Sequence, residues 1–210
     1  MSLQERIFAA VYDPLSKRWE EEHGAEIKRR VLARARGRVL EIGVGTGLSF
    51  PHYPEIDELV AIEPSEPMLR RARERAAELG REVTFVQAPA ERLPFADASF
   101  DTVVVMAVLC TVDDPESALR EVRRVLRADG RLLFLEHVRS GDPGRARWQD
   151  RLERPWGWLA GGCHPNRPTL ATIEAAGFAV EELEQGDLPG QPRLVRSYVL
   201  GAARPGVRPR

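Results

Sequence analysis

Seven short apolar segments recur along the chain, and segments with helical periodicity separate most of them. Apolar runs of this length are typical of buried β-strands, and they lie at Arg38–Ile42, Glu58–Ile62, Val83–Gln87, Thr102–Ala107, Arg131–His137, Ala179–Glu184 and Leu194–Leu200. Helical spacing covers Pro67–Leu79, Pro115–Leu126 and Thr169–Ala176. The alternation predicts an α/β fold: a seven-stranded, mostly parallel sheet with helices on both faces. A polar loop alone separates the last two strands, so we expect an antiparallel hairpin at one edge.

The beginning of the chain has a different pattern, charged and helical, with breaks expected at Asp13-Pro14 and at Gly24. We therefore expect residues 1–36 to form an amino-terminal helical cap. Residues 37–204 carry the strand and helix alternation, and no change of composition divides them. The sequence predicts one domain overall.

Composition narrows the classes of partner. The chain is 43% hydrophobic and 30% charged, with a formal net charge of −1, so nothing favours nucleic acid as a partner. It has no signal-peptide pattern and no apolar run of about 18 residues, so we expect a cytoplasmic protein without a transmembrane segment, as a monomer or homodimer. Its two cysteines, Cys110 and Cys163, are too few for a disulfide framework, and we expect reduced thiols.

A glycine-rich turn follows the first predicted strand, at Gly43, Gly45 and Gly47. Turns of this kind bind dinucleotides, nucleoside triphosphates or S-adenosylmethionine. Leu48 occupies the position of the third dinucleotide glycine, and the lysine–serine pair of a P-loop is missing. Glu41, two residues before the turn, would repel a phosphate but attract a cationic ligand such as an ammonium group.

Glu63 follows the second predicted strand, twenty residues after Gly43. In doubly wound folds a carboxylate at this place accepts hydrogen bonds from the two ribose hydroxyls. A helix cap before Pro64 is the other interpretation of the same residue. The distance from the glycine turn favours the ribose role.

Four segments resemble, in order and at the usual spacings, the motifs of one family. The segments "VLEIGVGTG", "AIEPSEPML", "APAERLPFADASFD" and "ALREVRRVLRADGRLLFLEHV" are similar to those of class I S-adenosylmethionine-dependent methyltransferases. Within that superfamily the chain resembles the UbiE-like group (methyltransferase type 11). The segments "VLCTVDDPESALREVRRVL" and "GGCHPNR" are most similar to the thiol S-methyltransferases. The resemblance implies a Rossmann-like fold, with residues 37–204 as the methyltransferase domain and S-adenosylmethionine as cofactor, leaving S-adenosylhomocysteine as product.

The resemblance also implies roles for individual residues in binding the cofactor. Glu41 and the backbone from Gly43 to Gly47 would face the methionine portion, and Glu63 would hold the ribose. The other implied cofactor contacts are Pro64 and Met68 beside the adenine, Ala90 and Glu91 at its edge, Ala107 and Val108 near the sulfonium, and Tyr12 closing over the cofactor. Pro89 stands where the family usually has an aspartate, so the adenine amino group needs another acceptor.

His137 is the candidate catalytic residue, because it ends the fifth predicted strand, where ligands bind in open α/β sheets, and imidazole titrates near neutrality. Trp148, Cys163 and His164 are candidate substrate residues in the long segment that follows. That segment would form either a lid or an amphipathic helix packed on the core. The four histidines do not cluster in sequence, so the sequence predicts no metal site.

The expected activity is methyl transfer to a small, apolar or lipid-like acceptor, with a thiol favoured. Phosphatidylethanolamine N-methylation and quinone C-methylation are the alternatives, and a cofactor-binding sensor or partner subunit is the non-enzymatic one. The thiol enzymes that the chain resembles carry a membrane-anchoring amino-terminal segment, where this sequence is charged. Peripheral contact with a membrane remains compatible with the sequence.

Overall fold

A seven-stranded sheet organises the chain, in the order β3-β2-β1-β4-β5-β7-β6. The computed structural model describes residues 12–14 and 16–206. The strands are β1 (Arg38–Ile42), β2 (Glu58–Ile62), β3 (Thr84–Val86), β4 (Phe100–Met106), β5 (Leu126–His137), β6 (Phe178–Asp187) and β7 (Ser197–Pro205). Strand β7 runs antiparallel to both β5 and β6, and every other pairing is parallel. The predicted mostly parallel sheet with an antiparallel edge pair is confirmed.

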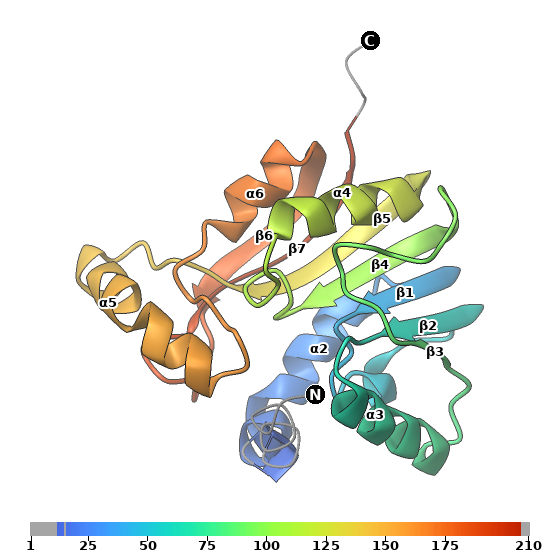
Figure 1. Ribbon diagram of the computed structural model, residues 1–210, viewed down its shortest axis with the longest axis horizontal. Helices are drawn as coiled ribbons and strands as arrows, with labels where there is room; N and C mark the ends of the chain where they lie inside the picture. The colour runs from blue at the N-terminus through green and yellow to red at the C-terminus, as the bar shows by residue number, and fades with distance from the viewer. Residues whose placement is uncertain (1–11, 15, 207–210) are drawn as a thin grey trace.

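Helices cover both faces of this sheet (Figure 1). The regular elements outside the sheet are η1 (Glu20–Gly24), α2 (Ala25–Leu32), η2 (Phe50–His52), α3 (Glu66–Glu78), α4 (Pro115–Val125), α5 (Pro143–Leu159) and α6 (Thr169–Ala175). One core cluster joins the sheet to α4 and α6, and a second joins it to α2 and α3. Within the described residues, no helix combines the length and the apolar character needed to cross a membrane.

Alternation along the central strands explains why two cores form. On β4, Val103 and Val105 belong to the core under α4, and Val104 belongs to the core under α3. On β1, Leu40 belongs to the core under α4, and Val39 belongs to the core under α3. Successive side chains of a strand point to opposite faces, so a continuous apolar run fills both layers.

Strand β7 lies several residues later than the sequence predicts. The expected strand was Leu194–Leu200, whereas pairing begins at Ser197 and continues to Pro205. The last residues of β7 are small, so they do not form the bulky apolar run from which a strand is predicted. Close packing requires that small size: a Cβ on Gly201 would lie 2.2 Å from the Glu182 carbonyl oxygen and 2.7 Å from the Phe134 ring.

The expected break at Gly24 is wrong, because the chain stays helical there, passing through a π-helical turn into α2. Gly24 is required by packing instead: an added Cβ would meet the Glu20 carboxylate at 2.5 Å and Trp19 at 2.7 Å. Residues 1–11 of the predicted cap lie outside the described residues, so its boundary stays a prediction.

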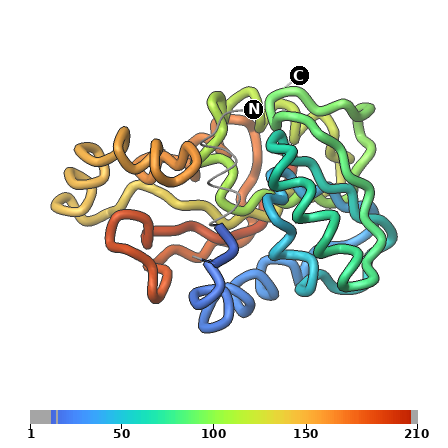
Figure 2. The backbone as a smooth tube through the Cα atoms, turned by 60° about the horizontal axis from the view of Figure 1, so that its bottom comes forward, coloured from blue at the N-terminus to red at the C-terminus, as the bar shows by residue number. Residues whose placement is uncertain are grey.

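The segment after β5 forms α5, which extends beyond the carboxyl ends of the strands (Figures 1 and 2). The expected alternatives were a lid or a helix whose tryptophans and leucines pack on the core. Trp148, Leu152, Trp158 and Leu159 are exposed, so the predicted packing is wrong for these residues, and Ala146 and Gln149 are the buried residues of α5. Trp156 is half-buried and packs against Cys110 and Cys163, and the lid stays a prediction. The helix packs through Ala146, Gln149 and Trp156, so the apolar spacing identified the helix but only part of its buried face.

Candidate active site

The glycine turn lies at the carboxyl end of β1, and all three of its predicted glycines have positive φ. An added Cβ on Gly43 would lie 2.6 Å from Val108, and one on Gly47 would lie 2.4 Å from Phe50. A Cβ on Gly45 would meet no atom within 4 Å, so this residue borders open space. The turn therefore packs against the protein at two glycines and leaves room for a ligand at the third.

A hollow opens beside this turn and gathers several of the predicted cofactor residues. It is lined by Tyr12, Lys28, Glu41, Gly43, Val44, Gly45, Thr46, Leu48, Ser49 and Met106. Asp13 holds the chain beside Tyr12 against the turn and α3, because its carboxylate accepts hydrogen bonds from the Thr46 hydroxyl at 2.5 Å and from Arg75 at 3.0 Å. Burial and the neighbouring Glu20 and Asp13 raise the pKa of Tyr12 to about 12, so its phenol stays neutral.

Glu41 is a buried carboxylate on the wall of this hollow. Its Oε2 accepts hydrogen bonds from the Ser49 hydroxyl at 2.8 Å and from the Tyr53 hydroxyl at 3.0 Å. Burial raises its pKa to about 7, although these hydroxyls and the charges of Lys28 and Arg81 act in the opposite direction. A cation beside Glu41 would stabilise its ionised form.

Glu63 lies across the turn from Glu41, at the end of β2. Its two oxygens accept hydrogen bonds from the backbone N–H groups of Gly45 and Ser65, both at 3.0 Å. Burial raises the pKa of Glu63, and these two donors oppose that shift. Each carboxylate oxygen can accept a second hydrogen bond, so the local contacts leave acceptor capacity for a ligand hydroxyl.

The residues predicted to surround an adenine lie in different environments. Met68 and Ala90 are buried, whereas Pro64 is exposed and its carbonyl accepts a hydrogen bond from Gln87. The Glu91 carboxylate accepts hydrogen bonds from the backbone N–H groups of residues 113 and 114, at 3.1 and 3.3 Å. Glu91 thus holds the loop before α4, a role that the sequence did not indicate.

The end of β4 turns sharply toward the glycine turn. Ala107 has a φ of 56°, a conformation that a non-glycine residue adopts only where its surroundings impose it. The buried Glu136 carboxylate holds the backbone that follows, because it accepts hydrogen bonds from the N–H groups of Val108, Leu109 and Cys110 at 2.8 to 3.1 Å. Burial raises the pKa of Glu136, and those three donors act against the shift.

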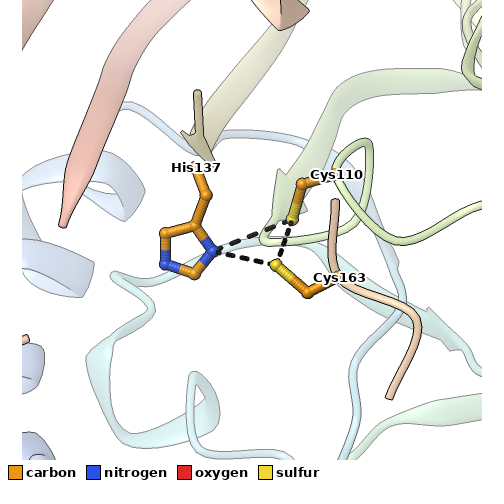
Figure 3. A group of neighbouring side chains, drawn as sticks. All are labelled: Cys110, His137 and Cys163. Atoms are coloured by element: carbon orange, nitrogen blue, oxygen red, sulfur yellow. Dashed lines mark hydrogen bonds between the residues drawn. The ribbon is translucent and has the colours of Figure 1, made fainter. Parts of the chain in front are cut away.

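The fold brings His137 together with both cysteines, although the three residues are far apart in sequence. The His137 Nδ1 lies 3.8 Å from the Cys110 Sγ and 3.7 Å from the Cys163 Sγ, and the two sulfurs are 3.9 Å apart (Figure 3). Contact with Cys163 and burial raise the pKa of Cys110, whereas the Cys110 contact lowers the pKa of Cys163. One histidine and both cysteines thus lie close enough to ligate a single metal ion, which the spacing of the histidines in sequence did not indicate. The expectation of no metal site stays a prediction.

The two other candidate substrate residues lie elsewhere. The His164 Nδ1 is 2.8 Å from the Glu153 carboxylate of α5, so its ring faces that helix rather than the cysteines. Trp148 lines a second hollow together with Asp142, Gly144, Arg145, Leu152, Arg193 and Leu194. None of these residues lines the hollow at the glycine turn.

Sequence reasoning missed Gln149, a fully buried side chain of α5. Its amide nitrogen donates to the carbonyls of Val138, Pro165 and Leu194 at 2.9 to 3.1 Å, and its Oε1 accepts from the Ser140 N–H at 2.8 Å. It thereby ties the end of β5 to the loop that carries Cys163. Nothing in its spacing distinguishes it from a surface glutamine.

Comparisons with known proteins agree with this geometry. The methyltransferase-domain family matches residues 40–134. The human thiol S-methyltransferase TMT1B is 36% identical over 203 residues, covering 92% of this chain and 83% of its own. A phosphatidylethanolamine N-methyltransferase from Cereibacter sphaeroides is 38% identical, covering 71% of this chain and 75% of its own. The solved structure of an S-adenosylmethionine-dependent methyltransferase from Thermotoga maritima, described as a possible histamine N-methyltransferase, superposes with a TM-score of 0.67 at 25% identity, covering 95% of this chain and 98% of that one. The chain thus belongs to the S-adenosylmethionine-dependent methyltransferases.

Proposed function

We propose that this methyltransferase moves the methyl group of S-adenosylmethionine to a small, apolar thiol. The observation that carries the choice of acceptor is the 36% identity with a thiol S-methyltransferase over 92% of the chain. The apolar surroundings of Cys110 and Cys163, packed with Val195 and Trp156 beyond the strand ends, support an apolar acceptor.

In this proposal the hollow at the glycine turn binds the methionine portion of the cofactor. Glu41 receives the ammonium group, which compensates the cost of ionising a buried carboxylate. The Gly45 backbone approaches the ligand closely, in agreement with the open space at its Cα. Tyr12 and Lys28, both in the proposed cap, line this hollow beside the ligand.

The nucleoside portion extends from the turn toward β3. Glu63 receives the ribose hydroxyls with the acceptor capacity that its two backbone contacts leave. Pro64 and Met68 flank the adenine, and Ala90 lines its edge. Glu91 is held by the loop before α4, so we assign the adenine amino group to a backbone carbonyl of this loop rather than to that carboxylate.

The acceptor binds beyond Ala107 and Val108, at the carboxyl ends of β4 and β5. S-adenosylmethionine supplies a methyl carbon that its positively charged sulfur already activates. The chain has to align the acceptor sulfur with that carbon and exclude water. A free thiol has a pKa of about 8.5, so it also needs help to ionise, and His137 provides that help in this proposal.

The remaining candidate substrate residues divide between two places. Cys163 lines the acceptor site itself. Trp148 and His164 act from α5 and its neighbouring loop, where exposed apolar side chains guide an apolar acceptor toward the site.

The test is formation of S-adenosylhomocysteine by the purified chain with alkyl and aryl thiols, a reduced quinone, and vesicles containing phosphatidylethanolamine. The proposal predicts product with the thiols and none above background with the other two. Product only with vesicles, or only with the quinone, would replace the thiol by that acceptor. Tight cofactor binding with no product from any acceptor would favour a sensor.

A further inference from the structure

Two thiols and one imidazole converge at the carboxyl ends of β4 and β5 in a way that the cofactor does not explain (Figure 3). Cys110 follows β4, His137 ends β5, and Cys163 comes from the loop after α5. We propose that these three side chains bind a soft divalent cation, represented by Zn²⁺, through two sulfurs and the Nδ1 of the imidazole.

The spacing of the three atoms fits tetrahedral coordination. Zinc–sulfur bonds of about 2.3 Å and zinc–nitrogen bonds of about 2.1 Å place tetrahedral ligands ~3.8 Å apart for two sulfurs and ~3.6 Å apart for sulfur and nitrogen. The observed separations are 3.9 Å between the sulfurs and 3.7 and 3.8 Å from them to Nδ1. A disulfide would need the sulfurs about 2.05 Å apart.

The backbone around the cluster is rigidly held, as a metal site requires. The Glu136 carboxylate accepts hydrogen bonds from three backbone N–H groups of the turn that carries Cys110. Arg167 donates to the carbonyls of Leu109 and Val112, both at 2.7 Å. The His164 N–H donates to the Cys110 carbonyl at 2.7 Å, which joins the loop of Cys163 directly to the turn of Cys110. The ligands would therefore need little rearrangement to bind a cation.

The neighbourhood of Cys163 also offers a donor for a thiolate. Trp156 packs against the two cysteines, and the weakly accepting Cys163 sulfur is the neighbour of its buried indole N–H. A neutral thiol accepts hydrogen bonds weakly, whereas a metal-bound thiolate accepts them well. The buried indole N–H is thus better satisfied when Cys163 is a ligand.

Three protein ligands make an open site rather than a closed structural one. In the part of the chain that the structure describes, no fourth histidine, cysteine or carboxylate joins the cluster. Structural zinc sites use four protein ligands, whereas sites with three keep a position for water or substrate. The three ligands lie at the same edge of the sheet as Gly43, which packs against Val108, two residues before Cys110.

A bound cation would give the acceptor the help that it needs to ionise, a step that rests on the proposed thiol acceptor. An acceptor thiol that coordinated a cation held by Cys110, His137 and Cys163 would release its proton to solvent, since a coordinating thiol is deprotonated. Its sulfur lone pair then forms the bond to the methyl carbon as the bond from that carbon to the sulfonium breaks. Thiolate and sulfonium become two neutral thioethers, and His137 acts as a ligand rather than as a base.

Metal binding is tested first, without any acceptor. The reduced, metal-free chain is titrated with Co²⁺ and Zn²⁺, and the thiolate-to-cobalt absorption is recorded. We expect one equivalent to bind, with a four-coordinate cobalt spectrum that Zn²⁺ displaces. Cys110→Ser, Cys163→Ser and His137→Gln should each weaken binding by more than ~100-fold, because a lost ligand costs more than a lost outer-shell partner. The control is His23→Gln, which changes a histidine of the π-helical turn and should bind Co²⁺ and Zn²⁺ as tightly as the parent chain.

Binding of S-adenosylhomocysteine, measured by calorimetry, shows whether each variant is folded, and His137→Gln replaces any cysteine variant that is not. No thiolate-to-cobalt absorption, or equal affinity in the ligand variants, would overturn the site. A reduced chain that binds no metal but forms a disulfide between the two cysteines on exposure to oxygen would identify a redox pair instead.

Activity then separates the inference from the proposed function. Thiol methylation that falls at least tenfold on metal removal and returns with Zn²⁺ supports both. Thiol methylation unaffected by metal removal keeps the proposed function and overturns the catalytic role of the cation. Tight metal binding without methylation of any thiol would overturn the thiol acceptor, while the metal site itself would still be supported.

Discussion

Glu41 is a buried carboxylate whose neighbours only partly offset the cost of its charge. With a pKa of about 7 it is protonated in half of the cofactor-free molecules at neutral pH. If its ionised form binds the cofactor ammonium, affinity for S-adenosylhomocysteine should rise with pH through this range. We expect about fivefold weaker binding at pH 6 than at pH 7, from the fraction ionised alone. Calorimetry should also detect proton release on binding, and Glu41→Gln should abolish both effects.

The same pKa makes a prediction about stability without cofactor. The unfolded chain ionises Glu41 near 4.5, whereas the folded chain ionises it near 7. Between those values the folded state binds more protons, so the free energy of unfolding falls as pH rises, by about 3 kcal/mol in total from this group. Denaturant titrations at pH 5 and pH 8 should show that Glu41→Gln removes this contribution. The exposed Glu78→Gln is the control, and an unchanged slope in Glu41→Gln would contradict the assignment.

Two glycines of the turn should respond differently to alanine. Both need positive φ, which costs roughly 1 kcal/mol for alanine. The new Cβ in Gly45→Ala would enter open space, whereas in Gly47→Ala it would lie 2.4 Å from Phe50. We expect Gly45→Ala to unfold within a few degrees of the parent but to bind S-adenosylhomocysteine about tenfold more weakly, since roughly 1.4 kcal/mol of contact is lost. Gly47→Ala should lose mainly thermal stability. Unchanged affinity in Gly45→Ala would place the ligand elsewhere.

At the scale of elements, Gln149 determines how α5 and its loop are attached. It makes four hydrogen bonds from a fully buried position. Gln149→Ala leaves those backbone groups unpaired, and we expect the free energy of unfolding to fall by about 2–4 kcal/mol. The exposed neighbour variant Trp148→Ala should change it by less than about 0.5 kcal/mol. Equal losses in the two variants, measured by denaturant unfolding, would contradict this role.

Elements with bulky apolar residues could be predicted from the sequence, and elements built from small or polar residues could not. Strands β1 and β2 have the predicted bounds, because their apolar runs end at a glycine and a proline signal. Strand β7 extends through Gly201, Ala202 and Ala203, whose small size suits a central strand but carries no pattern. The buried Ala146 and Gln149 of α5 could not be predicted either, because small and polar residues carry no apolar pattern.

At the scale of the whole molecule, the family resemblance grouped the glycine turn, Glu41 and Tyr12 at one cofactor site, and in the structure they line one hollow. The cluster of Cys110, His137 and Cys163 could not, because it depends on how α5 returns its loop to the strand ends. Glu136 and Gln149 set that path, and neither residue has a sequence signal. The proposed site of the methyl donor can thus be recognised from sequence motifs, whereas the proposed site of the methyl acceptor depends on tertiary structure.

The central claim, methyl transfer from S-adenosylmethionine to a thiol, is tested most directly with a methyl-labelled cofactor and a small apolar thiol. Mass spectrometry of the products follows both fragments in one reaction. The account predicts equal amounts of labelled methyl thioether and S-adenosylhomocysteine, formed over many turnovers. Bound cofactor that yields no labelled thioether from any thiol, while another acceptor is methylated, would contradict it.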